Sequence, residues 1–212
     1  DTRLGPIDMI DALVDGARTA LGVVAATACA GIIVGVVVKT GLGLALANSL
    51  VKLAGGSIML TLFLVMIASL VLGMGAPTTA NYVITSTIAA PAILTLLAPN
   101  TPMELVPLVT VMSAHFFVFY FGIIADITPP VALAAFAASG ISGGDPIKTG
   151  VHSAKLAIAA FIIPYMIVLQ PALLMVDVTI LQIVWVTISA VIGMIGIGAG
   201  IIGYWYRKLM WF

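Results

Sequence analysis

The chain has 212 residues, of which 62% are hydrophobic and only 8% are charged, and its formal net charge is zero. Soluble domains carry roughly 25% charged residues, so this composition and the mean hydropathy of +1.27 exclude an ordinary soluble domain. The absence of a basic segment gives no indication of a nucleic-acid partner. The single cysteine excludes an internal disulfide and gives no support for a metal site.

Long uncharged runs place the chain in a lipid bilayer. A helix needs about 20 predominantly apolar residues to cross the hydrocarbon core. Uncharged runs of the sequence cover 19–38, 53–103, 105–125, 127–144, 156–176 and 178–206. The longest of them has room for two crossings. We therefore predict an all-α integral membrane protein, a helical bundle that contains broken helices and a re-entrant hairpin.

The first half of the chain predicts four helical regions. Asp8, Asp11, Asp15 and Arg18 recur at helical spacing and predict an amphipathic helix at the membrane interface, which continues into an apolar helix over 20–38. Further helices are predicted over 44–53 and 58–72, and another over 78–97, where Pro91 predicts a kink.

The second half predicts one aromatic-rich helix, a half-helix and two further helices. These are expected over 103–125, 131–139, 156–175 and 178–203, with a polar loop over 139–146 and an aromatic and basic anchor over 204–208. Lysines flank the polar loop, as is typical of cytoplasmic loops. We divide the chain into an interfacial helix (1–19), a transport region (20–175) and a C-terminal membrane helix with its anchor (176–212).

Two motifs interrupt the apolar helices with glycine, proline and hydroxyl side chains. The first is Leu72–Ala80 (LGMGAPTTA), and the second is Gly122–Pro130 (GIIADITPP). Irregular backbone at membrane depth is tolerated only where it is buried in protein or lines a cavity. A pair of interrupted segments is the best indication of a transporter's binding site that a sequence offers.

The two breaks predict a site for an anion and its coupling ion. Carbonyl groups freed at a helix end can bind Na⁺, and amides at the start of the next helix can hold a carboxylate. The polar side chains at the breaks make Thr78, Thr79, Asn81, Asp126 and Thr128 the candidate binding residues. The candidate Na⁺ ligands are Gly73, through its carbonyl group, and Thr78 and Thr128. No catalytic residue and no cofactor other than Na⁺ is predicted.

Two titratable residues inside the apolar runs have alternative interpretations. Asp126 is costly in a bilayer and so indicates a function; it either caps the broken helix through the amides of residues 128–131, or binds an ion, or relays a proton. His115 lies in an aromatic run, and a neutral, packed histidine is favoured over a ligand.

With these motifs the chain resembles the large membrane subunit of TRAP transporters, the tripartite ATP-independent periplasmic family, and most closely the fused permeases that work with TAXI-type binding proteins. The resemblance rests on Leu72–Tyr82, on His115–Ala135, on Gly144–Gly150 and on the segment from Pro164 to Leu174. It extends over about 10–206, nearly the whole chain. The resemblance implies that two sets of residues line the binding site: Gly73, Gly75, Pro77, Thr78 and Thr79 at the first break, and Asp126, Thr128, Pro129 and Pro130 at the second.

This resemblance implies a function and a set of partners. The family moves organic anions such as dicarboxylates inward with Na⁺ by an elevator-like motion, across the bacterial inner membrane. A periplasmic solute-binding protein of the TAXI type delivers the substrate, and a small membrane subunit or its fused equivalent completes the assembly. The large subunit has two inverted repeats, and this multi-pass chain is expected to hold the second one as a fragment of a longer permease.

Three other classes of protein share some of these features. A different Na⁺-coupled anion carrier or a non-transporting channel subunit would also explain the broken helices. An intramembrane enzyme is disfavoured, because an aspartyl protease needs two membrane carboxylates, and Ser113 and His115 face apart on one helix.

Overall fold

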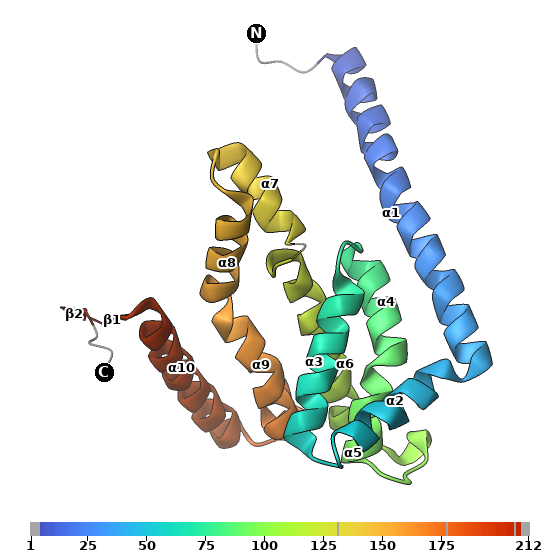
Figure 1. The fold of residues 1–212 in the computed structure, drawn as a ribbon, viewed down its shortest axis with the longest axis vertical. Helices are drawn as coiled ribbons and strands as arrows, with labels where there is room; N and C mark the ends of the chain where they lie inside the picture. The colour runs from blue at the N-terminus through green and yellow to red at the C-terminus, as the bar shows by residue number, and fades with distance from the viewer. Residues whose placement is uncertain (1–4, 131, 177, 206, 209–212) are drawn as a thin grey trace.

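The computed structural model describes residues 5–130, 132–176, 178–205 and 207–208, and it is almost entirely helical (Figure 1). Three helical segments are long and apolar enough to cross a membrane: Thr78–Leu97, Leu108–Ile127 and Ile180–Ile202. Two helix pairs, each bent at a short break, raise the number to five in the described ranges if each pair is one span. The prediction of an all-α membrane protein is confirmed.

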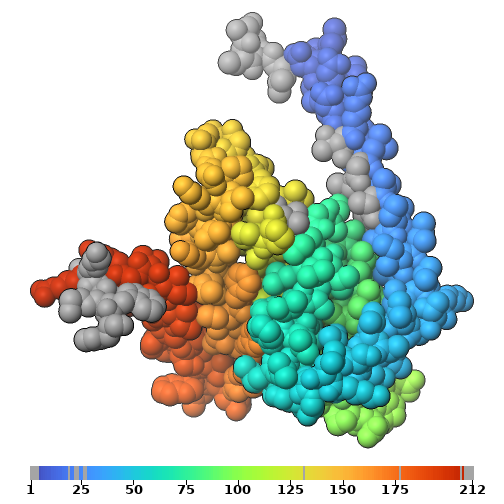
Figure 2. Space-filling model, in the orientation of Figure 1, coloured from blue at the N-terminus to red at the C-terminus, as the bar shows by residue number. Residues whose placement is uncertain are grey.

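A single long helix, α1 (Pro6–Thr40), forms one side of the molecule. No break separates its amphipathic start from its apolar remainder, which confirms the predicted continuation of one helix into the other. The upper part of α1 stands clear of the body (Figure 2), and Ile7 and Leu13 there are both 73% exposed. Gly41, with φ +68°, ends α1, and the chain bends by 75° into α2 (Leu42–Leu53).

Helices α3 (Ile58–Gly73), α4 (Thr78–Ile88) and α5 (Ala90–Leu97) follow. The predicted kink near Pro91 is confirmed, because α4 and α5 are separated at Ala89. Proline cannot donate to the carbonyl four residues earlier, which here is that of Thr87. A Cβ on Gly43 of α2 would lie 2.7 Å from this Thr87 oxygen, so only glycine lets α2 approach α4 so closely.

The core is built around α6 (Leu108–Ile124), which packs on α3, α4, α5 and α9 (Ile158–Leu169). Phe117 and Phe121 of α6 are fully buried and lie 4.9 Å apart between ring centroids. Tyr165 of α9 stacks edge-on against both rings. The aromatic cluster of the sequence is therefore packing, as expected.

The start of the predicted helix over 103–125 is wrong by several residues. Residues Met103–Leu105 form a separate 3₁₀ turn, η1, and α6 begins only after Pro107, whose fixed φ suits the residue before a helix. At its other end, α6 runs into a second 3₁₀ turn, η2 (Ala125–Ile127).

The segment after α7 (Leu133–Ser142) also differs from the prediction. The polar loop shrinks to 143–145, and residues Pro146–Leu156 form a helix, α8, that the sequence analysis missed. Asp145 caps α8 by accepting a hydrogen bond from the Lys148 amide at 2.8 Å, and Pro146 occupies the first helical position. The α8–α9 pair is bent by 40°.

The C-terminal part lies at the end of the molecule opposite α1 (Figure 1). The predicted helix over 156–175 ends early, because Gln170 is followed by the 3₁₀ turn η3 (Pro171–Leu174). Helix α10 (Ile180–Ile202) is mostly exposed and packs on α9 and η3. The aromatic and basic tail forms a two-stranded hairpin of β1 (Tyr204–Trp205) and β2 (Arg207–Lys208).

Candidate functional site

The first break lies between α3 and α4 and has the local structure that its sequence predicts. Gly73 ends α3, and Gly75 has φ +75°, a conformation that side chains disfavour. Pro77 precedes the first residue of α4, Thr78. The side chains of Thr78 and Thr79 are exposed. The first amides of α4 have no acceptor within the helix, so this end presents free donors and the positive end of the helix dipole.

The second break lies between α6 and α7 and includes η2. Thr128 donates its hydroxyl to the Ile124 carbonyl at 2.7 Å, which satisfies an oxygen at the end of α6. The Pro129–Pro130 bond is cis, and Ala132 has φ +38° immediately before α7 begins. Proline supplies no amide donor, so this segment cannot continue the helical hydrogen bonds.

One interpretation of the sequence has Asp126 cap the broken helix through the amides of residues 128–131, of which Pro129 and Pro130 have no amide hydrogen and residue 131 lies outside the described residues. The Asp126 side chain is partly buried in η2, and no residue in the described ranges donates a hydrogen bond to it. The amide of Thr128 instead donates to the Ala125 carbonyl at 3.3 Å. The interpretations of Asp126 as an ion ligand or a proton relay are not tested by this geometry.

Asn81 joins the two breaks across 41 residues of sequence. Its side-chain amide Nδ2 donates to the Gly122 carbonyl oxygen at 2.7 Å, and both groups are buried. A Cβ on Gly73 would lie 2.5 Å from Asn81 Nδ2, and one on Gly122 would lie 2.9 Å from the same atom. The Asn81 carboxamide therefore fills the space that two glycines leave open, one at the end of α3 and one near the end of α6.

A small cavity of about 150 Å³ lies where the two breaks meet. It is lined by Ile67, Leu70, Val71, Met74, Ala125, Thr128 and Pro129. Of the predicted site residues, only Thr128 and Pro129 line it. Thr78 and Thr79 lie at the exposed start of α4, and Gly73 and Asn81 lie in the buried contact beside it. Met74, Gly122 and Ala125 were not among the residues predicted from the sequence to form the site.

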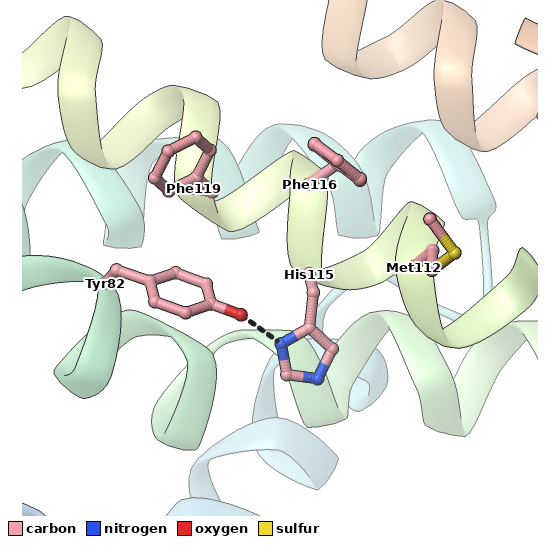
Figure 3. Close-up of a pocket in the computed structure, with 5 residues that line it drawn as sticks. All are labelled: Tyr82, Met112, His115, Phe116 and Phe119. Atoms are coloured by element: carbon pink, nitrogen blue, oxygen red, sulfur yellow. Dashed lines mark hydrogen bonds between the residues drawn. The ribbon is translucent and has the colours of Figure 1, made fainter. Parts of the chain in front are cut away.

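His115 is packed, as expected, but it also borders two cavities. Tyr82 of α4 hydrogen-bonds to His115 Nδ1 at 3.0 Å (Figure 3). With Met112, Phe116 and Phe119 the pair lines an apolar cavity of about 340 Å³. A second cavity of about 400 Å³ lies against the same imidazole. Among the described residues, no three His, Cys, Asp or Glu side chains gather closely enough to hold a metal ion.

Comparison with known proteins places the chain in a family. The model of the family described as "Tripartite ATP-independent periplasmic transporter, DctM component" matches residues 2–181. This range includes both breaks and ends at the start of α10. Neither a curated protein nor a solved structure matched the chain.

Proposed function

Because the chain belongs to the family of the DctM component of tripartite ATP-independent periplasmic transporters, we propose that it takes up organic anions together with Na⁺. The chain would contribute the second of two inverted repeats to a larger permease. The substrate carboxylate and the coupling ion would bind where the helices are broken. The family supports the general role of a permease subunit in such a transporter.

The polar groups of the two breaks support separate positions for the carboxylate and for Na⁺. The free amides at the start of α4, next to Thr78 and Thr79, suit a carboxylate. Na⁺ prefers hard oxygen ligands, and the carbonyl of Gly73 and the hydroxyls of Thr78 and Thr128 are the proposed ones. Asp126 would supply a carboxylate nearby. Gly75, Pro77, Pro129 and Pro130 would hold the backbone open.

The proposed partners follow from the tripartite family. A periplasmic solute-binding protein, of the TAXI type in our proposal, would deliver the anion. A small membrane subunit or a fused equivalent would complete the assembly in the bacterial inner membrane. The repeat would then carry the anion and Na⁺ across the bilayer by an elevator-like motion.

One observation carries the proposal: the two breaks lie against each other. Met74 from the first break and Thr128 from the second line the same cavity, and Asn81 bonds to Gly122 across them. Exposed backbone polar groups are costly in lipid, so two adjacent breaks indicate a site that serves one ligand set.

The test is uptake by the intact permease, reconstituted in liposomes with its binding protein. Radiolabelled dicarboxylates, 2-oxo acids and glutamate would be offered with an inward Na⁺ gradient or a K⁺ gradient. Replacing Thr78 and Thr128 together by valine removes two oxygen ligands. At about 1.4 kcal/mol each, their loss should lower Na⁺-dependent uptake about a hundredfold.

Thr87→Val is the matched control, because the Thr87 hydroxyl donates only to the Val83 carbonyl of its own helix. It should leave uptake unchanged. Full Na⁺-dependent uptake by the double valine variant would reject the proposed ligands.

A further inference from the structure

The buried polar side chains of the described chain differ in what they bond to. The hydroxyls of Thr61, Thr85, Ser113 and Ser139 all donate to carbonyls of their own helices. Asn81 alone among them hydrogen-bonds to another helix, and it is only 1% exposed. The bond connects α4 to a part of α6 that a helix ordinarily leaves unsatisfied, because Gly122 is in its last turn.

The fit around Asn81 is a matter of shape as well as hydrogen bonding. On the α6 side, the three atoms nearest to a Cβ added to Gly122 all belong to Asn81: Nδ2 at 2.9 Å, Cγ at 3.3 Å and Oδ1 at 3.4 Å. On the α3 side, a Cβ on Gly73 would meet Asn81 Nδ2 and the Ala125 Cβ, the latter at 2.8 Å. The carboxamide thus lies between the ends of two different broken helices.

We infer that Asn81 is a positioning residue, which holds the first break of the permease against the second. This inference rests on the proposed function and changes the role of Asn81 from a ligand for the anion or Na⁺ to a support for the groups that bind them. Its Nδ2 fixes the Gly122 carbonyl, and its bulk sets the spacing of α3 and α6. The first and the second break then keep a fixed position relative to each other.

The bilayer makes such a contact more important than it would be in a soluble protein. Lipid tails are as apolar as leucine, so apolar side chains gain little by packing helix against helix. Close approach at small residues and hydrogen bonds between helices have to supply the specificity. Asn81 supplies a hydrogen bond between helices and fills a close approach at two glycines. Its Oδ1 has no hydrogen-bond partner among the described residues. Removing the side chain therefore removes one hydrogen bond and one spacer.

The spacing of the breaks can be measured without transport. In the full chain with Cys29→Ala, cysteines replace Met74 and Thr128, which line the same cavity, and a short bis-methanethiosulfonate reagent links them. Asn81→Ala should lower the cross-linking rate about tenfold, the factor that corresponds to about 1.4 kcal/mol for one buried hydrogen bond. Asn81→Ser places a smaller polar side chain in the same space, too short to reach the Gly122 carbonyl. It should lower the cross-linking rate as Asn81→Ala does.

Thr85→Ala is the matched control. Thr85 lies one turn further along α4, is equally buried and donates only within its own helix. It should leave cross-linking unchanged. If Asn81→Ala and Thr85→Ala cross-link alike and at the parental rate, Asn81 does not position the breaks, and the inference is wrong.

Uptake by the intact permease separates a positioning role from a merely structural one. Asn81→Ser should raise the KM for the transported anion about tenfold, at parental amounts of folded protein, while the maximal rate falls much less. A lower maximal rate with unchanged KM would overturn the positioning role. If instead the parent protein shows no Na⁺-dependent uptake but cross-linking still depends on Asn81, the proposed function fails and the contact between the breaks stands.

Discussion

Gly122→Ala tests the contact between Asn81 and α6 directly. The three atoms nearest to the added methyl group all belong to the side chain of Asn81, with the closest approach at 2.9 Å to Nδ2. Real Cβ atoms seldom come so close to a neighbouring atom, so either the carboxamide moves or α4 does. Either movement breaks the hydrogen bond to the Gly122 carbonyl. The prediction is that the cost of this methyl group depends entirely on residue 81.

The magnitude follows from three terms. Overpacking a tight contact costs about 1–3 kcal/mol, and breaking the buried hydrogen bond costs about 1 kcal/mol more. Alanine in place of glycine inside a helix recovers about 1 kcal/mol. Gly122→Ala should therefore destabilise the protein by about 1–3 kcal/mol. In the Asn81→Ala background the clash is absent, and the same change should stabilise it by about 1 kcal/mol.

The assay is a double-mutant cycle. The parent, both single variants and the double variant are unfolded with SDS from mild detergent micelles, and helix content is followed by circular dichroism. The expected coupling between residues 81 and 122 is about 2–4 kcal/mol, which reaches beyond the range of about 0.5–3 kcal/mol that is usual for residues in contact. If Gly122→Ala has the same effect with asparagine and with alanine at position 81, the described contact does not exist in the protein.

Two further predictions concern Asp126 and Tyr82. Asp126→Asn should leave the unfolding free energy within about 0.5 kcal/mol of the parent, because no described group bonds to this side chain. It should weaken the Na⁺ dependence of uptake, and an unstable variant with normal Na⁺ dependence would instead make Asp126 structural. Tyr82→Phe removes the hydrogen bond to His115 and should cost about 1 kcal/mol in the same SDS titration. An unchanged transition would mean that the bond is not formed in the membrane protein.

The sequence predicted those features of the fold that depend on local chemistry. Glycine at Gly73 and Gly75 followed by Pro77 specifies a break and a new helix start, and the structure begins α4 at the next residue. Pro91 likewise produced the separation of α4 from α5. These residues act on their own backbone, through φ or a missing amide, so no knowledge of distant contacts was needed.

Helix α8 could have been found by the same local reasoning. Asp145 followed by Pro146 is a capping residue followed by proline at the first helical position, which is a standard start signal. The lysines at 148 and 155 directed the interpretation toward a loop instead. Charge near the membrane surface does not distinguish a loop from a short polar helix, so the start signal was the better guide.

The partnership of Asn81 with Gly122 was not accessible in this way. The two residues are 41 positions apart, and neither motif contains a signal for the other. The sequence identified Asn81 as a polar group near a break and therefore as a candidate ligand. Only the packing of α4 on α6 places its carboxamide in a buried contact with two glycines. Gly122 is the first residue of the second motif, but the sequence predicted no role for it.

The position of Asn81 has a consequence for how the two breaks can move. Tyr82, the next residue of α4, bonds to His115, about two turns from Gly122 on α6. Adjacent residues on α4 thus hold α6 at two levels, one at the break and one beside the aromatic cavity. Two contacts at different heights oppose both the sliding of α4 along α6 and its rotation against α6. The proposed elevator-like motion should therefore move α3, α4 and α6 as one body, with bending confined to segments outside these contacts.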